Sequence, residues 1–354
     1  MPAAAQGRGP LARLCLLACA ARAAGQDAQE SCRVDAEGQA WEHVANTSAT
    51  FSYTFTKRET KLMKHVLVSL EALRYCFGDV FVVIDVPHAQ PGGHAEFLSS
   101  KKGRKALEKA EAAARGAAAL LQQRCHGTGA PQATWRVKVL DYDSPELREA
   151  VLREYSDPRA VPDPLRLEPP KRAVLENPKT WIYGHMYKTA MATDALLRWP
   201  GGRYVFHADA DMVVRRTEAR CRGSGFVEAA LTLMRSDDRV YSAAPVIARL
   251  NADTGRYEAT PGGNPFQGRW PEGRALASLF NHGGEGAAFQ SSMDTQCFLL
   301  DVERFRGLFP LAFPREAAEV LWSHSLNKRP AGAYQVQMDP ASVGVYYEPT
   351  RGPG

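Results

Sequence analysis

The 354-residue sequence lacks the spacings that several common functional classes require. Its seven cysteines include no C-x-x-C pair, which argues against a structural zinc cluster. No G-x-x-x-x-G-K-[ST] segment occurs, which disfavours a P-loop nucleoside triphosphatase. The net charge is only +5 and most basic residues are scattered, so composition gives no case for nucleic-acid binding. What is left is a globular protein, for which a hydrophobic content of 45% and a charged content of 23% are typical.

A long apolar run is also missing near the N-terminus, where residues 14–21 read LCLLACAA. This run is too short to span a bilayer. Arg8 and Arg13 precede it, and Ala21-Arg22-Ala23 follows it as an A-x-A sequence. The layout is typical of a secretory signal peptide, which we predict over residues 1–24; the alternative is an alanine-rich disordered leader.

The residues after this leader also suit a lumenal protein. Residues 25–49 are predicted to be a polar lead-in, and they contain the N-glycosylation sequon Asn46-Thr47-Ser48. A single large domain is expected over residues 50–350. Cys32, Cys76, Cys125, Cys221 and Cys297 follow the leader, and because their number is odd, at least one stays unbridged in a monomer. We therefore expect a protein of the ER or Golgi lumen, or a secreted one.

Strand and helix patterns alternate along the domain. Residues 51–56 alternate aromatic and hydroxyl side chains as a strand does, 62–75 has helical spacing, and 80–84 is a continuous apolar run. This βαβ unit predicts two parallel strands. Further predicted elements are the helices 101–124, 181–199, 225–234, 302–309 and 315–326 and the strands 135–140, 240–247 and 295–300. The fold class is therefore α/β, a mostly parallel sheet flanked by helices.

Two stretches of the domain have a less regular character. Residues 101–124 are rich in charge and alanine, which predicts an exposed helix; a basic face that binds an acceptor is the alternative to a solvated face. Residues 251–290 are rich in glycine, asparagine and proline with scattered aromatics, which predicts a long irregular loop with a functional role.

The stretch that carries most chemical information is residues 203–214, RYVFHADADMVV. Asp209 and Asp211 lie between two apolar runs, where like charges at close range are costly. Hard cations such as Mg²⁺ and Mn²⁺ take oxygen ligands and share them with phosphates, so a bound cation would offset that cost. A second D-x-D, Asp141-Tyr142-Asp143, is followed by Ser-Pro and is better explained as a turn.

Three aspartates follow predicted strands: Asp85, Asp141 and Asp209. The carboxyl ends of parallel strands lie along one edge of a sheet, and ligands of such sheets bind beyond that edge. We therefore expect these carboxylates to lie along one binding edge.

The βαβ unit that ends in Asp85, the HADAD strand and the later SSMDTQCFLLDVERF segment together resemble GT-A glycosyltransferases over residues 50–350. The D-x-D of that family holds Mn²⁺ or Mg²⁺ against the diphosphate of a nucleotide sugar. By this resemblance Asp211 is a direct metal ligand, and Asp209 contacts the metal or the ribose. The FLLDVERF tail is loosely similar to glycogenin-like families, but the later Asp-Gln-Asp run of those families is absent.

The resemblance implies further roles along the chain. Thr56 and Arg58 would hold the base and phosphate of the nucleotide, Asp85 its base or ribose, and Lys188 its diphosphate. The alternatives are a turn hydroxyl for Thr56, solvated cations for Arg58 and Lys188, and a strand-end cap for Asp85.

A third metal ligand in this fold is often a histidine near the C-terminus. His324 is the better placed candidate and His282 the competitor. Asp294 stands where an inverting enzyme needs a carboxylate base, although it could equally bind the acceptor or cap an element.

The predicted function is metal-dependent transfer of a sugar, by a hexosyltransferase, from a nucleotide-sugar donor to a hydroxyl of a glycan, glycoprotein or glycolipid. Two alternatives stay open: a metal-dependent nucleotidyltransferase, and a catalytically silent secreted sugar-binding module on the same scaffold. No nucleic-acid partner and no transmembrane span are expected.

Overall fold

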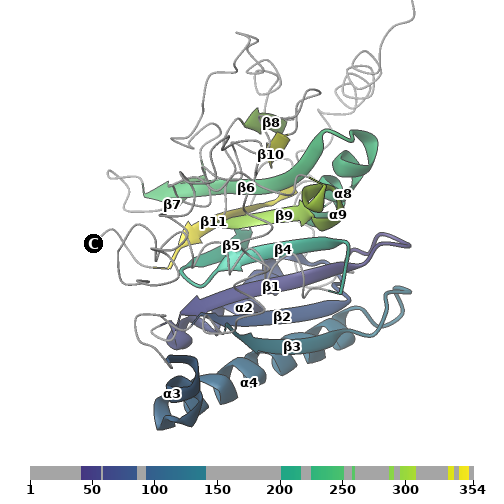
Figure 1. The fold of residues 1–354 in the computed structure, drawn as a ribbon. Coiled ribbons are helices and arrows are strands. Elements are labelled where there is room, and N and C mark those ends of the chain that lie inside the picture. Colours follow the sequence, from purple (N-terminus) through teal and green to yellow (C-terminus); the bar gives the residue numbers. More distant parts are fainter. Residues whose placement is uncertain are drawn as a thin grey trace, which may run out of the picture.

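The computed structural model describes residues 41–56, 59–85, 93–140, 201–216, 225–250, 257–259, 287–290, 296–307, 334–338 and 343–350. Their strands form one twisted sheet with helices packed against it, as Figure 1 shows. In spatial order the main strands are β3 (Thr134–Val139), β2 (Asp79–Asp85), β1 (Ala49–Thr56), β4 (Tyr204–Asp209), β9 (Cys297–Asp301), β6 (Val240–Leu250), β10 (Tyr334–Met338) and β8 (Ala287–Gln290). The predicted fold class, a mostly parallel α/β sheet flanked by helices in one domain, is confirmed.

Among the eight main strands, four of the seven neighbouring pairs are parallel. Strands β3, β2, β1 and β4 pair in parallel, and so do β6 and β10. Strand β9 is antiparallel to both β4 and β6, so these two run in the same direction on either side of it. Strand β8 is antiparallel to β10. The arrowheads of β1 and β6 point to the left in Figure 1, which is therefore the side of the carboxyl ends.

The order of the strands reverses next to β1. From β1 the chain adds β2 and then β3 on one side, and it later returns to place β4 on the other side of β1. A parallel α/β sheet with such a reversal binds ligands in the crevice outside the carboxyl ends of the two strands at the switch point. The β1–β4 boundary is therefore the part of the fold in which to look for a site.

Along β1, aromatic side chains point to one face of the sheet and hydroxyl side chains to the other, and these are the apolar and polar faces of β1. Phe51, Tyr53 and Phe55 alternate along it and are fully buried. Phe51 stacks on Phe206 of β4 with ring centroids 5.7 Å apart, and Phe206 meets Phe226 at 6.1 Å. Because side chains alternate along a strand, the hydroxyl residues of β1 project to the opposite face.

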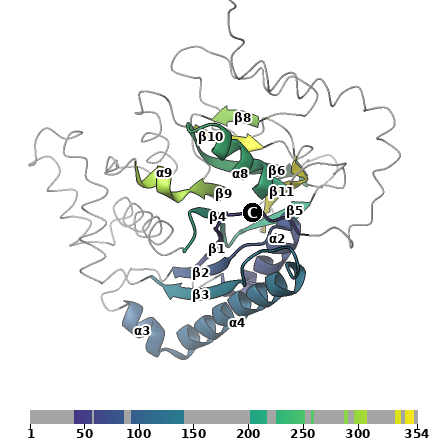
Figure 2. The same ribbon diagram turned by 90° about the vertical axis from the view of Figure 1, so that its right-hand side faces the viewer.

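Helices α2 (His65–Leu73), α4 (Lys101–Arg124) and α8 (Phe226–Ser236) contribute buried side chains to the core on the apolar face. Figure 2 shows α4 running beside β2 and β3. The short elements η2 (Thr60–Leu62) and α3 (Gly93–Ser99) precede α2 and α4, and α9 (Val302–Arg306) follows β9. The bounds of α2, α4, α8 and α9 and of β1 to β3, β6 and β9 agree with the sequence prediction to within a few residues, whereas α3 was not predicted.

Helix α4 is less exposed than its charge predicts. It begins after Ser100, whose hydroxyl accepts a hydrogen bond from the Gly103 backbone N–H at 2.9 Å, the pattern of an N-cap. A residue with a side chain does not fit at position 103, because its Cβ atom would lie 1.7 Å from the Phe97 carbonyl oxygen. The alanines at positions 106, 110, 114, 117 and 118 are buried, while most of the charged side chains are exposed. The helix therefore has a solvated charged face and an alanine face in the core.

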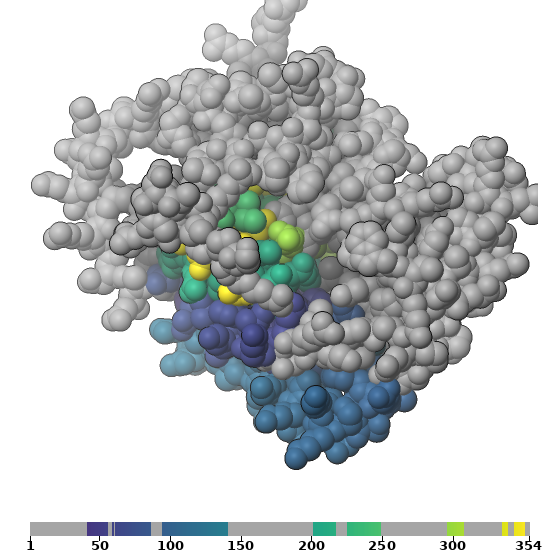
Figure 3. Space-filling model, turned by 90° about the vertical axis from the view of Figure 1, so that its left-hand side faces the viewer, coloured from purple at the N-terminus to yellow at the C-terminus, as the bar shows by residue number. Residues whose placement is uncertain are grey.

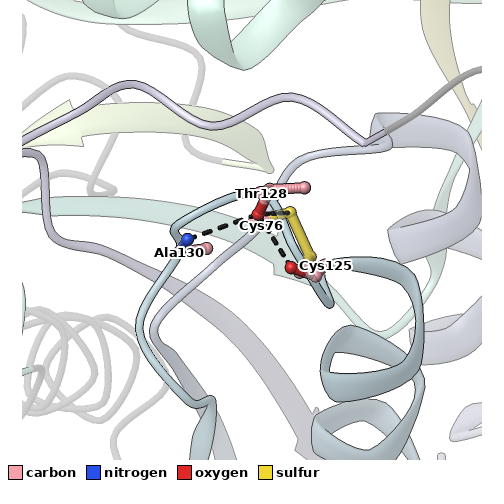
Figure 4. Close-up of a disulfide and its surroundings, with 4 residues drawn as sticks. All are labelled: Cys76, Cys125, Thr128 and Ala130. Carbon is pink, nitrogen blue, oxygen red and sulfur yellow. Dashed lines mark hydrogen bonds between the residues drawn. A yellow bond between two sulfur atoms is a disulfide. The ribbon is translucent and has the colours of Figure 1, made fainter.

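A disulfide joins the C-terminal end of α4 to the segment that follows α2. Cys76 and Cys125 are bonded across a sequence separation of 49 residues (Figure 4). Thr128 braces the turn after the helix, because its hydroxyl donates to the Cys125 carbonyl at 2.8 Å and accepts the Ala130 N–H at 3.3 Å. Cys297, on β9, is a buried thiol.

Three short strands extend the sheet. Strand β5 (Met212–Arg216) pairs with β11 (Val345–Pro349), which in turn pairs with β6. Strand β7 (Tyr257–Ala259) is antiparallel to β6. The prediction of an irregular loop over residues 251–290 is wrong at β7 and β8, because both segments form backbone pairs with neighbouring strands that no local pattern reveals.

Residues 41–48, at the end of the polar lead-in segment, pack on the domain. Trp41 is buried in the core, and the Glu42 backbone pairs with the Tyr75 region through hydrogen bonds to Arg74 and Cys76. Asn46 lies in an exposed turn with a positive φ of 58°. None of the described helices is both long and apolar enough to cross a membrane.

Candidate metal–diphosphate site

The D-x-D sequence forms the turn between β4 and β5. Asp209 is the last residue of β4, Ala210 and Asp211 make the turn, and Met212 begins β5. Both aspartates are half-buried, whereas Ala210 and Met212 are buried. The carboxylates therefore lie at the border between the core and the surface, at the carboxyl end of the strand next to the switch point.

Backbone hydrogen bonds fix both aspartates from other parts of the chain. The Asp209 N–H donates to the Gln296 carbonyl at 2.8 Å, just before β9. The Thr350 N–H donates to the Asp211 carbonyl at 2.6 Å, just after β11. One bond restricts the backbone before Ala210 and the other the backbone after it. Distant segments of the chain therefore help to fix the geometry of the turn.

The start of β5 is held from the apolar face of the sheet. The Tyr53 hydroxyl of β1 donates to the Met212 carbonyl, and the Ser69 hydroxyl of α2 accepts the Val214 N–H at 3.1 Å. Burial raises the pKa of Tyr53 far above its ordinary value, and the nearby carboxylates of the turn act in the same direction. Tyr53 is therefore a permanent hydrogen-bond donor that anchors the turn, and it is no candidate for an acid or base.

On the polar face, the Asp209 carboxylate contacts a histidine. His207 Nε2 lies 3.1 Å from Asp209 Oδ1. The His207 side chain is only 4% exposed, whereas that of Asp209 is 41% exposed. His207 had no predicted role, although its position two residues before Asp209 on a strand already places both side chains on one face.

Two more predicted residues lie along the same edge of the sheet. Thr54 of β1 is opposite Asp209 of β4, and Thr56, the last residue of β1, is opposite Asp85, the last residue of β2. Strands are about 4.8 Å apart and rise about 3.3 Å per residue, so the backbones of Asp85 and Asp209 lie roughly 12 Å apart. Asp85 is buried, at 2% exposure. The expected convergence of Asp85 and Asp209 on one edge is thus present.

The donor atoms of the turn suit a hard divalent cation. Magnesium is usually bound through one or two carboxylates together with the phosphates of a substrate, and manganese accepts the same oxygen ligands. Asp209 and Asp211 provide two such carboxylates on one short turn. Among the described residues, no group of three or more His, Cys, Asp or Glu side chains is arranged to hold a metal ion. The Asp209–Asp211 pair is therefore the part of a candidate metal site that these residues contain.

Several predicted site residues fall outside the described residues. They are Arg58, Lys188, Asp294, His324 and its competitor His282, together with Asp141 and Asp143 of the second D-x-D. Thr56 is described as a strand residue only, without its side chain. Their proposed roles stay predictions.

Figure 3 views the molecule from the side of the carboxyl ends. Purple residues from the N-terminal strands, teal and green residues from the middle of the chain and yellow residues from the C-terminal segment gather in one patch of this face. The patch agrees with the backbone contacts above, in which segments near residues 53, 211, 296 and 350 meet.

Comparison with known proteins adds little beyond the architecture. No protein-family model and no curated protein matches the chain. Among solved structures, the chain is similar to the crystal structure of GalNAc-T7 with UDP, GalNAc and Mn²⁺, with a TM-score of 0.39 and 9% identity over 87% of this chain. It spans 44% of that protein, less than half of its length. A second similar structure is a mycobacterial protein, with a TM-score of 0.33, 12% identity, and coverage of 87% of this chain and 69% of that one. At these values neither likeness establishes a family or an activity.

Proposed function

We propose that the protein is a metal-dependent glycosyltransferase that moves a sugar, as a hexosyltransferase, from a nucleotide-sugar donor to an acceptor hydroxyl. The observation that carries this proposal is the position of the Asp209–Asp211 turn. It lies at the carboxyl end of β4, next to the switch point between β1 and β4, where sheets of this kind bind nucleotides. Two half-exposed carboxylates there repel an anionic diphosphate unless a cation lies between them and it.

The proposed roles follow from place and charge. Asp211 and Asp209 would hold Mn²⁺ or Mg²⁺, and the cation would offset the negative charge that develops on the leaving diphosphate. The buried Asp85, across β1 from the metal turn, contacts the ribose or base. The backbone bonds from Gln296 and Thr350 keep the turn in place before the donor binds, which preorganises the ligands.

The remaining predicted residues complete this proposal. Thr56, the last residue of β1, and Arg58 hold the base and phosphate of the nucleotide, and Lys188 neutralises the diphosphate. His324 is the third metal ligand, and Asp294 is the base or an acceptor-binding group. The acceptor is a glycan, glycoprotein or glycolipid.

A lumenal location is part of the same proposal. Disulfides persist in oxidising compartments and are rare in the cytosol, and this domain has the Cys76–Cys125 bridge. The sequon residue Asn46 is exposed in a turn, where a glycan has room. Both observations support passage through the ER and Golgi, together with the predicted signal peptide over residues 1–24.

The test compares the two D-x-D sequences of the chain. Asp211→Asn preserves size but removes a charge that the cation needs, and Asp143→Asn is the matched change in the other D-x-D. Thermal unfolding of both variants and the wild type is measured with UDP-, GDP- and CMP-sugars, with and without Mn²⁺. We expect one nucleotide class to stabilise the wild type and Asp143→Asn only with Mn²⁺, by about 2.7 kcal/mol at a hundred-fold excess over Kd.

Asp211→Asn should fold normally and show neither this stabilisation nor sugar transfer. If both variants behave alike, or if Asp143→Asn is the inactive one, the site is misplaced. A wild type that binds no nucleotide with any divalent metal refutes the enzyme and favours a silent module. Release of pyrophosphate from a nucleoside triphosphate and a sugar 1-phosphate, with no transfer from any nucleotide sugar, identifies a nucleotidyltransferase.

A further inference from the structure

The polar face of the sheet carries a row of buried polar atoms that ends at Asp209. Thr50 and Ser52 of β1 are fully buried, and His207 of β4 is the cross-strand neighbour of Ser52. In the part of the chain that the structure describes, Thr50 Oγ1, Ser52 Oγ and His207 Nδ1 have no hydrogen-bond partner. Buried polar groups usually have partners, so such a row next to a candidate site calls for a functional explanation.

We propose that His207 is a positioning residue, which donates its Nε2–H to Asp209 and thereby fixes the orientation of the carboxylate that binds the cation. The inference rests on the proposed function for the role of Asp209. An ionised aspartate only accepts hydrogen bonds, so the contact of 3.1 Å places the hydrogen on Nε2. In the neutral ring Nδ1 then carries no hydrogen, and neither it nor the nearby Ser52 hydroxyl has a hydrogen-bond partner among the described residues.

The packing around His207 makes it suited to this role. Phe298 of β9 is its other cross-strand neighbour, and the two ring centroids lie 5.2 Å apart. The imidazole is therefore held between two strands, and its side chain is 4% exposed against 41% for Asp209. A rigid buried donor restricts a half-exposed carboxylate to the rotamer that the contact requires. Asp211 provides the second carboxylate of the turn.

Outer-shell hydrogen bonds of this kind orient ligands and change metal affinity by about 10–100-fold when they are lost. His207→Gln keeps an N–H donor at a position close to that of Nε2, because the two side chains place these nitrogens at a similar distance from Cβ. His207→Leu has a similar volume and no donor. Comparing His207→Gln with His207→Leu therefore distinguishes the effect of the hydrogen bond from the effect of the packing of the ring.

The first measurement does not involve the metal. NMR of the metal-free protein with ¹⁵N-labelled histidine is expected to show His207 as the Nε2–H tautomer with a slowly exchanging ring proton, assigned by its loss in His207→Gln. In Asp209→Ala this proton should exchange faster. A ring in the Nδ1–H tautomer, or a proton that Asp209→Ala does not affect, overturns the positioning contact.

The second measurement is Mn²⁺ affinity without nucleotide, from the free Mn²⁺ signal in electron paramagnetic resonance. We expect about 10–100-fold weaker binding by His207→Leu and binding within a few-fold of wild type by His207→Gln, with both variants folded by circular dichroism. Equal affinities in all three proteins, or equal losses in both variants, overturn the proposal. If His207→Leu does not fold, the tautomer result and the Mn²⁺ affinity of His207→Gln still test the positioning contact. A wild type that binds neither Mn²⁺ nor Mg²⁺, alone or with nucleotide, refutes the proposed function itself, and the NMR result distinguishes that failure from a wrong contact.

Discussion

The buried carboxylate of Asp301 allows a quantitative test of what stabilises the sheet. Asp301 ends β9, its side chain is fully buried, and Arg203 donates to it from Nη2 at 2.8 Å and from Nε at 3.2 Å. It also caps α9 by accepting the Arg304 N–H at 3.1 Å. One carboxylate thus joins the start of β4 to the start of a helix.

Asp301→Ala removes both functions. Breaking a buried ion pair costs about 3–5 kcal/mol, and loss of an N-cap costs about 1 kcal/mol. Arg203 is 44% exposed, so water replaces part of what its guanidinium loses. We therefore expect the free energy of unfolding to fall by about 3 kcal/mol. Asp301→Asn keeps a cap and neutral acceptors, and it should cost about 1–1.5 kcal/mol.

The assay is urea unfolding, with Glu303→Ala as the matched control. Glu303 pairs with the same Arg203 at 3.4 Å but is 72% exposed, so its loss should cost less than about 1 kcal/mol. Asp301 lies opposite Tyr204, about 17 Å along β4 from Asp209, so Mn²⁺ affinity should not change. Equal destabilisation by Asp301→Ala and Glu303→Ala would show that burial does not determine the strength of this pair.

Three further predictions follow from features away from the site. Replacing both members of the Cys76–Cys125 disulfide by alanine should lower the unfolding free energy by about 4 kcal/mol, as expected for a closed loop of this length; a loss below about 1 kcal/mol in urea titrations would contradict it. Hydrogen bonds from Arg239 lower the pKa of Asp237, so the stability it adds is present above the ordinary aspartate pKa of about 4 and is lost as pH falls through the lower folded value. Asp237→Asn should accordingly flatten the acid limb of a stability-against-pH curve, and an unchanged limb would refute this. Secreted protein should start near residue 24 and carry a glycan at Asn46 by mass spectrometry, whereas unglycosylated cytosolic protein with an intact leader would disprove the lumenal route.

Local patterns predicted those parts of the fold that depend on neighbours in sequence. The continuous apolar run of β2 predicted a strand buried on both faces, and every residue of Asp79–Asp85 is buried. Asp85 and Asp209 were expected along one edge, because parallel strands end together. The register in which Thr54 and Thr56 separate them confirms this reasoning.

Contacts between distant segments were not predictable from the sequence. Tyr53 and Met212 are 159 residues apart, and the partners Thr350 and Asp211 are also far apart in the chain, so no periodicity links them. The antiparallel direction of β9 is equally invisible in its apolar run. Helix α4 was misjudged for another reason: charge dominates its composition, whereas its core face consists of alanines spaced four residues apart.

The hydrogen bonds that hold the Asp209–Asp211 turn come from near the start of the domain, at Tyr53, and from its end, at Thr350, and this has a consequence for how the protein is made. Strands β1, β2 and β3, helix α4 and the disulfide all lie within residues 49–139, so they can form early while the ribosome is still producing the rest. Strand β5 has its antiparallel partner only when residues 345–349 have been synthesised, and Asp211 gains its bond from Thr350 only then. The strands β1 to β3, helix α4 and the disulfide can therefore form before the two carboxylates are fixed, and completion of the Asp209–Asp211 turn is a late event in biogenesis.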